Sequence, residues 1–367
     1  MRIRRFRAES FRNIESCDIT FSDGVNLLFG ENAQGKTNAI EGIYLFARGK
    51  SFRKTGEKEL FRFGEEGFSL SLSYEKEGEE NTLSYTVFKN ERKRMKNGYK
   101  VGLSEMIGDF RAVLFTPDHL LLVKQGPEER RSFLDIAISQ CYPSYLKYYA
   151  DYKKTVEERN ALLRFASKGM AIDHEELRSW SYSLAQYASY IYLYRKKYIE
   201  RLEGYASSFM KEISDGRETL SLSYKCDIEN TEDRAVAMKR YLTVFTSETA
   251  REISAGTTLF GILRDDMEIS LNEKSARFFA SQGQQRSVVL SLKLAEGEVS
   301  REITGEYPVF LFDDVLSELD EKRREYLLKE RGDKQILITS CSKGESDLAS
   351  ETVIEVKNGV FHTVRNN

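Results

Sequence analysis

The sequence predicts an α/β fold: a P-loop head on a mixed sheet with an antiparallel N-terminal β part, into which an α-helical arm is inserted. Three observations indicate this fold. A glycine-rich loop follows the apolar run 25–29, and a second apolar run, 309–312, ends in two aspartates. Between them, segments with two-residue apolar alternation give way to segments with three- and four-residue spacing. The glycine-rich loop and the two aspartates are separated by more residues than one compact nucleotide-binding domain would place between them. This separation indicates an inserted domain.

The length of 367 residues suits about two to three domains. We expect residues 1–122 to form the first part of the head, with the P-loop and a β subdomain. Residues 123–255 are expected to form the inserted helical arm with a short antiparallel coiled coil, and residues 256–367 the second part of the head.

Composition narrows the class of protein. The four cysteines lie far apart and only three histidines accompany them, so neither a zinc site nor a disulfide framework is indicated. No apolar run approaches the length of a membrane span, and we expect a cytoplasmic protein without a membrane partner. The net charge of −2 gives no support to nucleic-acid binding, which must depend on local basic clusters.

Residues 30–37 read Gly-x4-Gly-Lys-Thr in the strand, loop and helix context that a phosphate loop needs. The glycines let successive backbone N–H groups curl around phosphate oxygens at a helix N-terminus. We expect Lys36 to reach the β- and γ-phosphates of ATP and the Thr37 hydroxyl to bind Mg²⁺. A simple glycine-rich turn is the alternative. The residues expected to bind nucleotide here are Gly30, Glu31, Asn32, Ala33, Gln34, Gly35, Lys36, Thr37 and Asn38.

The second phosphate element is the buried-strand run 309–312 followed by Asp313 and Asp314. A carboxylate at the C-terminal end of a strand beside the P-loop strand is where Mg²⁺ needs its protein ligand, so Asp313 is the candidate metal ligand. Asp314 is expected to orient or deprotonate the attacking water. Together with Lys36 these are the candidate catalytic residues. A helix N-cap at the end of a strand is the alternative.

The segment Ser281-Gln-Gly283-Gln284 has capping-box spacing and precedes an apolar repeat typical of a helix. A helix N-terminus with a small hydroxyl and a glycine is a second phosphate cradle. One nucleotide has a single γ-phosphate, so the natural solution is two copies facing each other head to tail, each completing the other's site. A plain capped helix is the alternative.

In this order the motifs resemble those of ABC-type ATPases, with "SQGQQ" as the signature and "SELD", ending at Asp320, as the D-loop. The combination resembles the RecF family, relatives of the SMC and Rad50 ATPases. The matching pieces are "FRNI" at 11–14, "GENAQGKTNAIEGI" at 30–43, "FTPDHLLLVKQGPEERRSFLD" at 115–135, "RDD" at 264–266, "SQGQQRS" at 281–287 and "DDVLSELD" at 313–320.

The resemblance implies an ATP- and Mg²⁺-dependent homodimer that binds DNA near single-strand gaps and is released by slow hydrolysis. It also implies RecO and RecR as partners in loading a recombinase. In this family Ser281, Gly283 and Gln284 would act on the twin's nucleotide, with Asp320 nearby, and Arg12 would contact nucleotide phosphate or adenine. A surface arginine is the alternative for Arg12.

The chain departs from the family pattern at three places. Ile262 and Leu263 precede "RDD" where the family usually has Pro-His, which weakens any role for Arg264. Thr339 and Ser340 stand where ABC proteins carry the switch histidine. For the Q-loop glutamine, only Gln125 is a candidate.

The inserted region changes period at about residue 123. Before it, alternation at 68–74 and 83–87 and an Asn97-Gly98 turn predict β-hairpins. After it, apolar residues from Leu177 to Phe209 keep helical spacing over about four heptads, with Asp173 placed as N-cap and Tyr145–Leu163 as a shorter partner stripe. The helical spacing of the tyrosines favours packing over base stacking.

Basic clusters occur at 48–54, 89–96 and 195–197. Most charge runs are solvated faces, and acidic runs balance these. The second cluster lies on a predicted hairpin, a suitable place for gripping a phosphate backbone. The candidate DNA contacts there are Lys89, Arg92, Lys93, Arg94 and Lys96.

The function that these motifs predict is an ATP-driven DNA-binding switch. One alternative is an ABC-type energy module for a membrane partner; the tyrosine-rich arm argues against it. Another alternative is an ATP-gated nuclease of the overcoming-lysogenisation type; the segment after Asp320 is too short for its nuclease domain.

Overall fold

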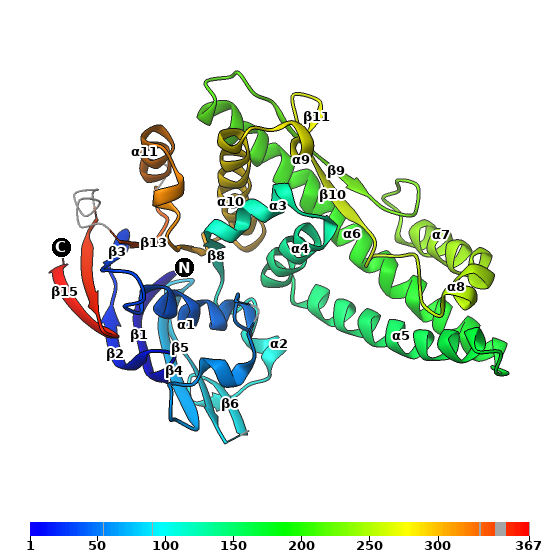
Figure 1. Cartoon of the computed structure of the whole chain (residues 1–367), viewed down its shortest axis with the longest axis horizontal. Coiled ribbons are helices and arrows are strands. Elements are labelled where there is room, and N and C mark those ends of the chain that lie inside the picture. Colours follow the sequence, from blue (N-terminus) through cyan, green and yellow to red (C-terminus); the bar gives the residue numbers. More distant parts are fainter. Residues whose placement is uncertain (54, 90, 330–331, 342–349, 367) are drawn as a thin grey trace.

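The structure, a computed structural model, describes residues 1–53, 55–89, 91–329, 332–341 and 350–366. Two lobes are evident (Figure 1): a head lobe of two six-stranded sheets around helix α1, and an elongated arm lobe of helices with one small sheet. Within the described residues no helix combines the length and apolar content that crossing a bilayer requires.

The first sheet of the head lobe is antiparallel, as predicted. Its order is β2 (Ile14–Thr20), β1 (Arg2–Phe11), β4 (Gly67–Lys76), β5 (Glu79–Phe88), β6 (Glu91–Lys96), β7 (Tyr99–Lys100). The predicted alternation of β4 is confirmed, because Phe68, Leu70, Leu72 and Tyr74 are all buried. The β6–β7 turn holds Asn97 and Gly98 at φ 49° and 85°, as a tight hairpin requires.

The second sheet is parallel except at one edge. Its order is β15 (Val360–Asn366), β14 (Thr352–Lys357), β3 (Val25–Phe29), β13 (Ile336–Ser340), β12 (Val309–Phe312), β8 (Ala112–Phe115), with only β15 antiparallel. Helix α1 (Lys36–Arg48) lies between the two sheets. The five residues of β3 are all buried, because Leu28 belongs to the core around α1 while Leu27 belongs to the core on the other face of the sheet.

One sequence expectation about this sheet is wrong. The strand β12, which Asp313 directly follows, does not pair with β3; β13 lies between them and pairs with both. All three strands are parallel, so their C-terminal ends still meet at one edge of the sheet, and the side chains after them remain close.

The arm lobe is built on the 40-residue helix α6 (His174–Ile213), capped by the Asp173 carboxylate as predicted. Short and long helices surround it: α3 (Leu121–Lys124), α4 (Pro127–Cys141), α5 (Pro143–Ser167), α7 (Arg234–Ser247), α8 (Thr249–Ala255) and α10 (Gln282–Thr304). A small sheet of β9 (Leu220–Lys225), β10 (Asp266–Leu271) and β11 (Lys274–Ser275) runs along it.

The apolar stripe of α6 has more than one partner along its length. Near its start Ser181 accepts a hydrogen bond from Arg159 of α5, and near its end Met210 contacts Ser291 of α10. A coiled coil with α5 alone therefore does not describe the stripe, because α5 has 25 residues and the rest of α6 packs elsewhere. The domain boundary expected at 255/256 remains a prediction; β9 and β10 pair across it.

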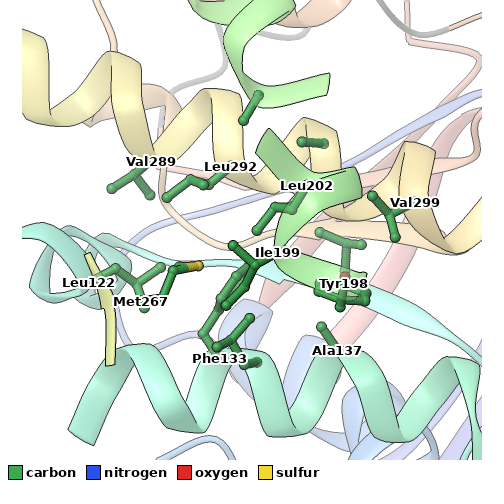
Figure 2. Packing of buried hydrophobic residues seen from close by; sticks show 14 of the residues in the cluster. Leu122, Phe133, Ala137, Tyr198, Ile199, Leu202, Met267, Val289, Leu292 and Val299 are labelled. Atoms are coloured by element: carbon green, nitrogen blue, oxygen red, sulfur yellow. The ribbon is translucent and has the colours of Figure 1, made fainter. Parts of the chain in front are cut away.

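The core of the arm lobe positions helix α10. In Figure 2, Val289, Leu292 and Val299 of α10 lie against side chains of α6 and α4. The labelled partners are Leu122, Phe133, Ala137, Tyr198, Ile199, Leu202 and Met267. Because this face of α10 is fully buried, the N-terminal end of the helix is held rigidly at the surface.

The remaining short elements connect these parts. They are η1 (Glu57–Leu60), α2 (Leu103–Met106), η2 (Pro117–Leu120), α9 (Ala276–Phe279), η3 (Leu316–Glu318) and α11 (Glu321–Lys329).

Candidate functional site

The loop between β3 and α1 has the backbone of a phosphate cradle. Gly30 and Gly35 have φ of 155° and 120°. A Cβ on Gly30 would lie 2.2 Å from the Val356 carbonyl oxygen, so the close approach of β14 requires glycine there. The loop ends directly in the first turn of α1, whose free N–H groups favour an anion.

Lys36 is folded back on this loop. Its Nζ donates to the carbonyl oxygens of Gly30 at 2.6 Å and Glu31 at 2.8 Å, and the side chain is buried. These carbonyls hold the ammonium over the concave side of the loop, where the β- and γ-phosphates of a nucleotide would replace them as partners.

Thr37 and Asp313 meet across the sheet edge, as their expected roles require. Thr37 Oγ1 donates to Asp313 Oδ1 at 2.8 Å, and Thr339 Oγ1 donates to the same oxygen at 2.8 Å. Burial raises the pKa of Asp313, against the lowering effect of these hydroxyls. A hydroxyl and a carboxylate at one point are the hard oxygen donors that Mg²⁺ prefers.

No cluster of three or more carboxylate, thiol or imidazole ligands occurs among the described residues. A Mg²⁺ ion that takes only Thr37 and Asp313 from the protein must complete its shell with phosphate oxygens and water, which is its usual state beside a nucleotide. The donor set therefore fits nucleotide-bound Mg²⁺.

Asp314 and Thr339 are coupled through the backbone. The Asp314 N–H donates to Thr339 Oγ1 at 2.9 Å, and Asp314 has a left-handed φ of 53°. This turn directs the two neighbouring carboxylates differently, so that Asp313 is buried and Asp314 is half-buried. Thr339, at the place of a switch residue, thus contacts both aspartates.

Cys341 is a member of the site that sequence reasoning missed. Its Sγ lies 3.7 Å from Lys36 Nζ, 2.8 Å from Asn32 Oδ1 and 3.7 Å from Asp314 Oδ1. Its only sequence signal is its position directly after β13, at the edge where the other site residues gather.

The outer side of the loop is braced by two segments. Gln34 accepts from the N–H groups of Asn358 and Gly359, in the β14–β15 turn. Asn13 donates to the Ala33 carbonyl at 3.0 Å and accepts from Asn38 at 2.6 Å. The loop conformation is therefore fixed by tertiary contacts and not only by its own glycines.

Beside the loop lies a pocket of about 510 Å³, lined among others by Arg12, Asn13, Asn38, Arg53 and Phe63. Its size suits a base with its ribose. Arg12 forms a bidentate pair with the fully buried Glu41, with N–O distances of 2.7 and 3.0 Å. This pairing fixes the guanidinium at the pocket, so the residue is more than a surface arginine.

The second cradle is in the arm lobe. Ser281 caps α10 and forms the full capping box with Gln284, with distances of 3.3 and 2.8 Å. The Gly283 carbonyl accepts from Arg323 at 2.9 Å, and Arg323 also pairs with Asp320, which caps α11. Both expectations, a capped helix and a cradle, are compatible with this geometry.

The two cradles do not meet within one chain. Among the described residues, no hydrogen bond or ion pair joins 281–284 to 30–37. In Figure 1 the start of α10, next to α9, lies in the arm lobe, away from the β3–α1 loop. The structure thus brings Lys36, Thr37, Asp313 and Asp314 together and keeps the capped end of α10 apart.

Gln125 and Arg264, the candidates named where the chain departs from the family pattern, make no hydrogen bond or ion pair with the P-loop among the described residues. Gln125 is exposed, and its carbonyl accepts from Arg130. Arg264 is also exposed, whereas the next residue, Asp265, is buried and pairs with Arg195 at 3.3 Å. The "RDD" segment therefore contributes to the arm core, and Arg195, counted in a basic cluster, is fully buried there.

The basic hairpin is partly neutralised. Arg92 pairs with Glu57 at 2.8 Å, Lys96 with Asp109 at 2.9 Å, and Lys89 with Glu66 at 3.6 Å. Arg94 lies over the Tyr85 ring at 4.7 Å. The remaining predicted contact, Lys93, is exposed on β6.

Residues 2–362 match the family model described as RecF/RecN/SMC N terminal domain. The chain is 35% identical to the DNA replication and repair protein RecF of Clostridioides difficile (strain 630), over 100% of this chain and 99% of that protein. The chain belongs to the RecF family. A RecF of an Exiguobacterium species is 38% identical to this RecF-family chain, over 99% of it and 97% of the relative.

Solved structures agree with the RecF family assignment. The structure described as the recombination mediator protein RecF-ATPrS in the RecFOR pathway is 32% identical, with a TM-score of 0.92 over 99% of this chain and 98% of the other. An SMC head bound to the C-winged helix domain of ScpA, 16% identical with a TM-score of 0.58 over 99% of this chain and 98% of the other, shares the fold. The predicted family and fold class are confirmed.

Proposed function

We propose that this chain is an ATP-dependent DNA-binding protein of recombinational repair that uses hydrolysis as a switch. ATP and Mg²⁺ hold two copies together, the closed dimer clamps DNA at single-strand gaps or junctions, and hydrolysis opens it. The observation that carries this proposal is the separation of two phosphate cradles into two lobes of one chain. Full-length similarity to proteins named for DNA replication and repair supports a role in DNA repair.

Nucleotide binding within one copy begins at the P-loop. The β- and γ-phosphates take the place of the Gly30 and Glu31 carbonyls as partners of Lys36. The backbone N–H groups of the loop and of the first turn of α1 bind the remaining phosphate oxygens. The base and ribose enter the pocket that Arg12 and Asn13 line.

Thr37 and Asp313 hold Mg²⁺, which supplies charge neutralisation on the phosphate oxygens. Asp314, half-buried beside the Asp313 site, orients the attacking water and accepts its proton. Thr339 keeps the two carboxylates in their separate roles, because it donates to Asp313 and accepts from the Asp314 backbone.

The twin completes the site. Ser281, Gly283 and Gln284 of one copy present a helix N-terminus to the γ-phosphate of the other, with Asp320 beside them. A two-fold axis makes both sites equal, so two nucleotides lie in the interface. Loss of either γ-phosphate removes the anion that both cradles share, and the dimer opens.

DNA contact is assigned to the β6 hairpin. Lys93 is exposed on β6, and Lys89, Arg92, Arg94 and Lys96 lie on the same hairpin, where Glu66, Glu57 and Asp109 partly offset the charges of Lys89, Arg92 and Lys96. RecO and RecR are the expected protein partners, since the solved relative is described as a mediator of the RecFOR pathway.

The test separates nucleotide binding from dimer formation. Lys36→Ala should abolish binding of a fluorescent ATP analogue. Ser281→Arg should leave that binding intact but prevent ATP-driven dimerisation in sedimentation velocity, because a side chain and a positive charge then fill the cradle. Ser179→Arg, at an exposed position of α6, is the matched control and should dimerise normally. A Ser281→Arg variant that dimerises like the wild type would show that the cradle is not shared.

A further inference from the structure

Three phenylalanine side chains stand out by their exposure. Phe63, Phe278 and Phe279 are 101%, 74% and 69% exposed, ahead of Phe88 at 57% and Phe165 at 51%. A phenylalanine can bury about 150–250 Å² of mostly apolar surface, so three of them left in water indicate a surface awaiting a partner.

Phe63 lies at the nucleotide side of the head lobe. It lines the 510 Å³ pocket together with Arg12, Asn13 and Asn38. Asn13 also donates to the P-loop residue Ala33. A nucleotide whose phosphates occupy the P-loop would therefore have the fully solvent-exposed side chain of Phe63 beside its base.

Phe278 and Phe279 lie at the other cradle. They end α9, and only Ala280 separates them from the N-cap Ser281, so their Cα atoms lie within about 10 Å of it by chain length. The Arg277 guanidinium lies 5.3 Å from the centre of the Phe278 ring. Helix α9 is anchored by the buried Ala276, which gives the exposed pair a rigid base.

These positions are complementary in the dimer proposed above. When the capped end of α10 of one copy faces the P-loop of the other, the aromatic pair before it faces the pocket that Phe63 borders. We propose that Phe278 and Phe279 of each copy pack on Phe63 and on the nucleotide base of its twin, enclosing the base only when the dimer closes. This inference rests on the proposed function and adds a base-recognition surface in trans.

The occupant is a second copy because the contact is continuous with the shared phosphate site and is repeated by the two-fold axis. An aromatic surface over the base would favour a purine, whose larger ring system stacks more strongly. The stability of the dimer would thus depend on which base the nucleotide carries, as would binding to the pocket of one copy.

The first test is the double variant Phe278→Ser/Phe279→Ser. Monomer binding of the fluorescent ATP analogue should be unchanged, whereas the ATP-driven dimer should weaken at least about tenfold in sedimentation velocity, which corresponds to about 1.4 kcal/mol. Phe165→Ser, at the end of α5, is the matched control and should dimerise as the wild type does. Equal dimerisation of the double variant and the control would overturn the inference.

The Ser281→Arg variant distinguishes the two levels of the proposal. If Ser281→Arg also dimerises normally, the shared site itself is wrong. If Ser281→Arg fails to dimerise but the double phenylalanine variant dimerises normally, only the aromatic contact is wrong. Normal dimerisation of the double variant with weaker retention of single-stranded DNA would assign the pair to DNA bases and equally overturn the inference.

A base probe tests the contact directly. The triphosphate of 2-aminopurine riboside fluoresces less when its base stacks on an aromatic ring, so its fluorescence should fall on dimerisation of the wild type. The fall should be lost in Phe63→Ser and in the double variant, and combining them should add nothing further. Quenching that is unchanged in both variants, or effects that simply add, would contradict a joint contact.

Discussion

The ion pair between Arg159 and Glu252 in the arm lobe is fully buried, so its loss should strongly destabilise the arm. Both side chains are 0% exposed, with Nη2 of Arg159 2.5 Å from Oε2 of Glu252. Arg159 also donates to Ser181 and Thr258, and the other Glu252 oxygen accepts from the Leu259 N–H at 2.8 Å. This network joins α5, α6 and α8.

Glu252→Gln keeps the shape and one acceptor but leaves the Arg159 charge buried without a counter-charge. Removing one partner of a buried pair costs about 3–5 kcal/mol, because the remaining charge is not solvated. At a denaturant dependence of about 3 kcal/mol/M, the urea midpoint of the arm should fall by about 1–2 M. Helix content followed by circular dichroism during urea titration measures this.

Two comparisons make the test decisive. Glu268→Gln removes an exposed pair with Lys225 in the same lobe and should leave the midpoint unchanged. Replacing both partners, Arg159→Met with Glu252→Leu, should recover most of the lost stability, because no charge remains buried. If Glu252→Gln behaved like Glu268→Gln, the pair would not stabilise the arm in solution and the reasoning would be refuted.

The remaining predictions concern protons, thiols and DNA. Burial raises the pKa of Asp265 to about 6. Asp265 then keeps its proton to higher pH in the folded state than in the unfolded state. The wild-type free energy of unfolding should therefore fall by about 3 kcal/mol between pH 4 and pH 6, relative to that of Asp265→Asn. Above pH 6, the plots of stability against pH for the two proteins, measured by thermal unfolding, should run parallel. Parallel curves throughout would contradict this. Cys341 is the exposed cysteine among the four. Its labelling by N-ethylmaleimide should be blocked by ATP and should speed up at alkaline pH, because partial desolvation of the thiol and the nearby Asp314 carboxylate raise its pKa; labelling that ATP does not affect would place the thiol outside the site. Lys93→Ala with Arg94→Ala should reduce the salt dependence of DNA binding by about two units of slope in a fluorescence anisotropy titration, whereas Lys168→Ala in the arm turn should not. An unchanged slope would remove the hairpin from the DNA surface.

Residue patterns within short segments predicted their structures well. Asp173 caps α6 and Ser281 forms a capping box because both depend on residues two or three positions away. The same holds for the Asn97-Gly98 turn and for the alternation along β4. In each case the interacting groups are fixed by backbone geometry, so the sequence already contains the contact.

Contacts between distant segments were predicted only in part. Thr37 and Asp313 were expected at one metal ion, and their oxygens lie 2.8 Å apart. The intervening strand β13 was not foreseen, because strand order depends on which long connections cross the sheet, and no local pattern records it. Cys341 enters the site through that same strand, so it was missed for the same reason.

By itself, the sequence determined the glycine-rich loop before α1, the paired aspartates after β12 and the capped helix α10, because each depends on residue types at short spacing. It also determined the family to which the chain belongs, because several such motifs follow one another in the family's order. Only the tertiary structure decided that Arg195 is a buried counter-charge to Asp265 and that Arg12 forms an ion pair with Glu41. It also decided that α6 packs on α5 near its start and on α10 near its end. These features depend on which surfaces exclude water when distant segments pack, and burial changes the energy of a charge far more than its neighbours in sequence do.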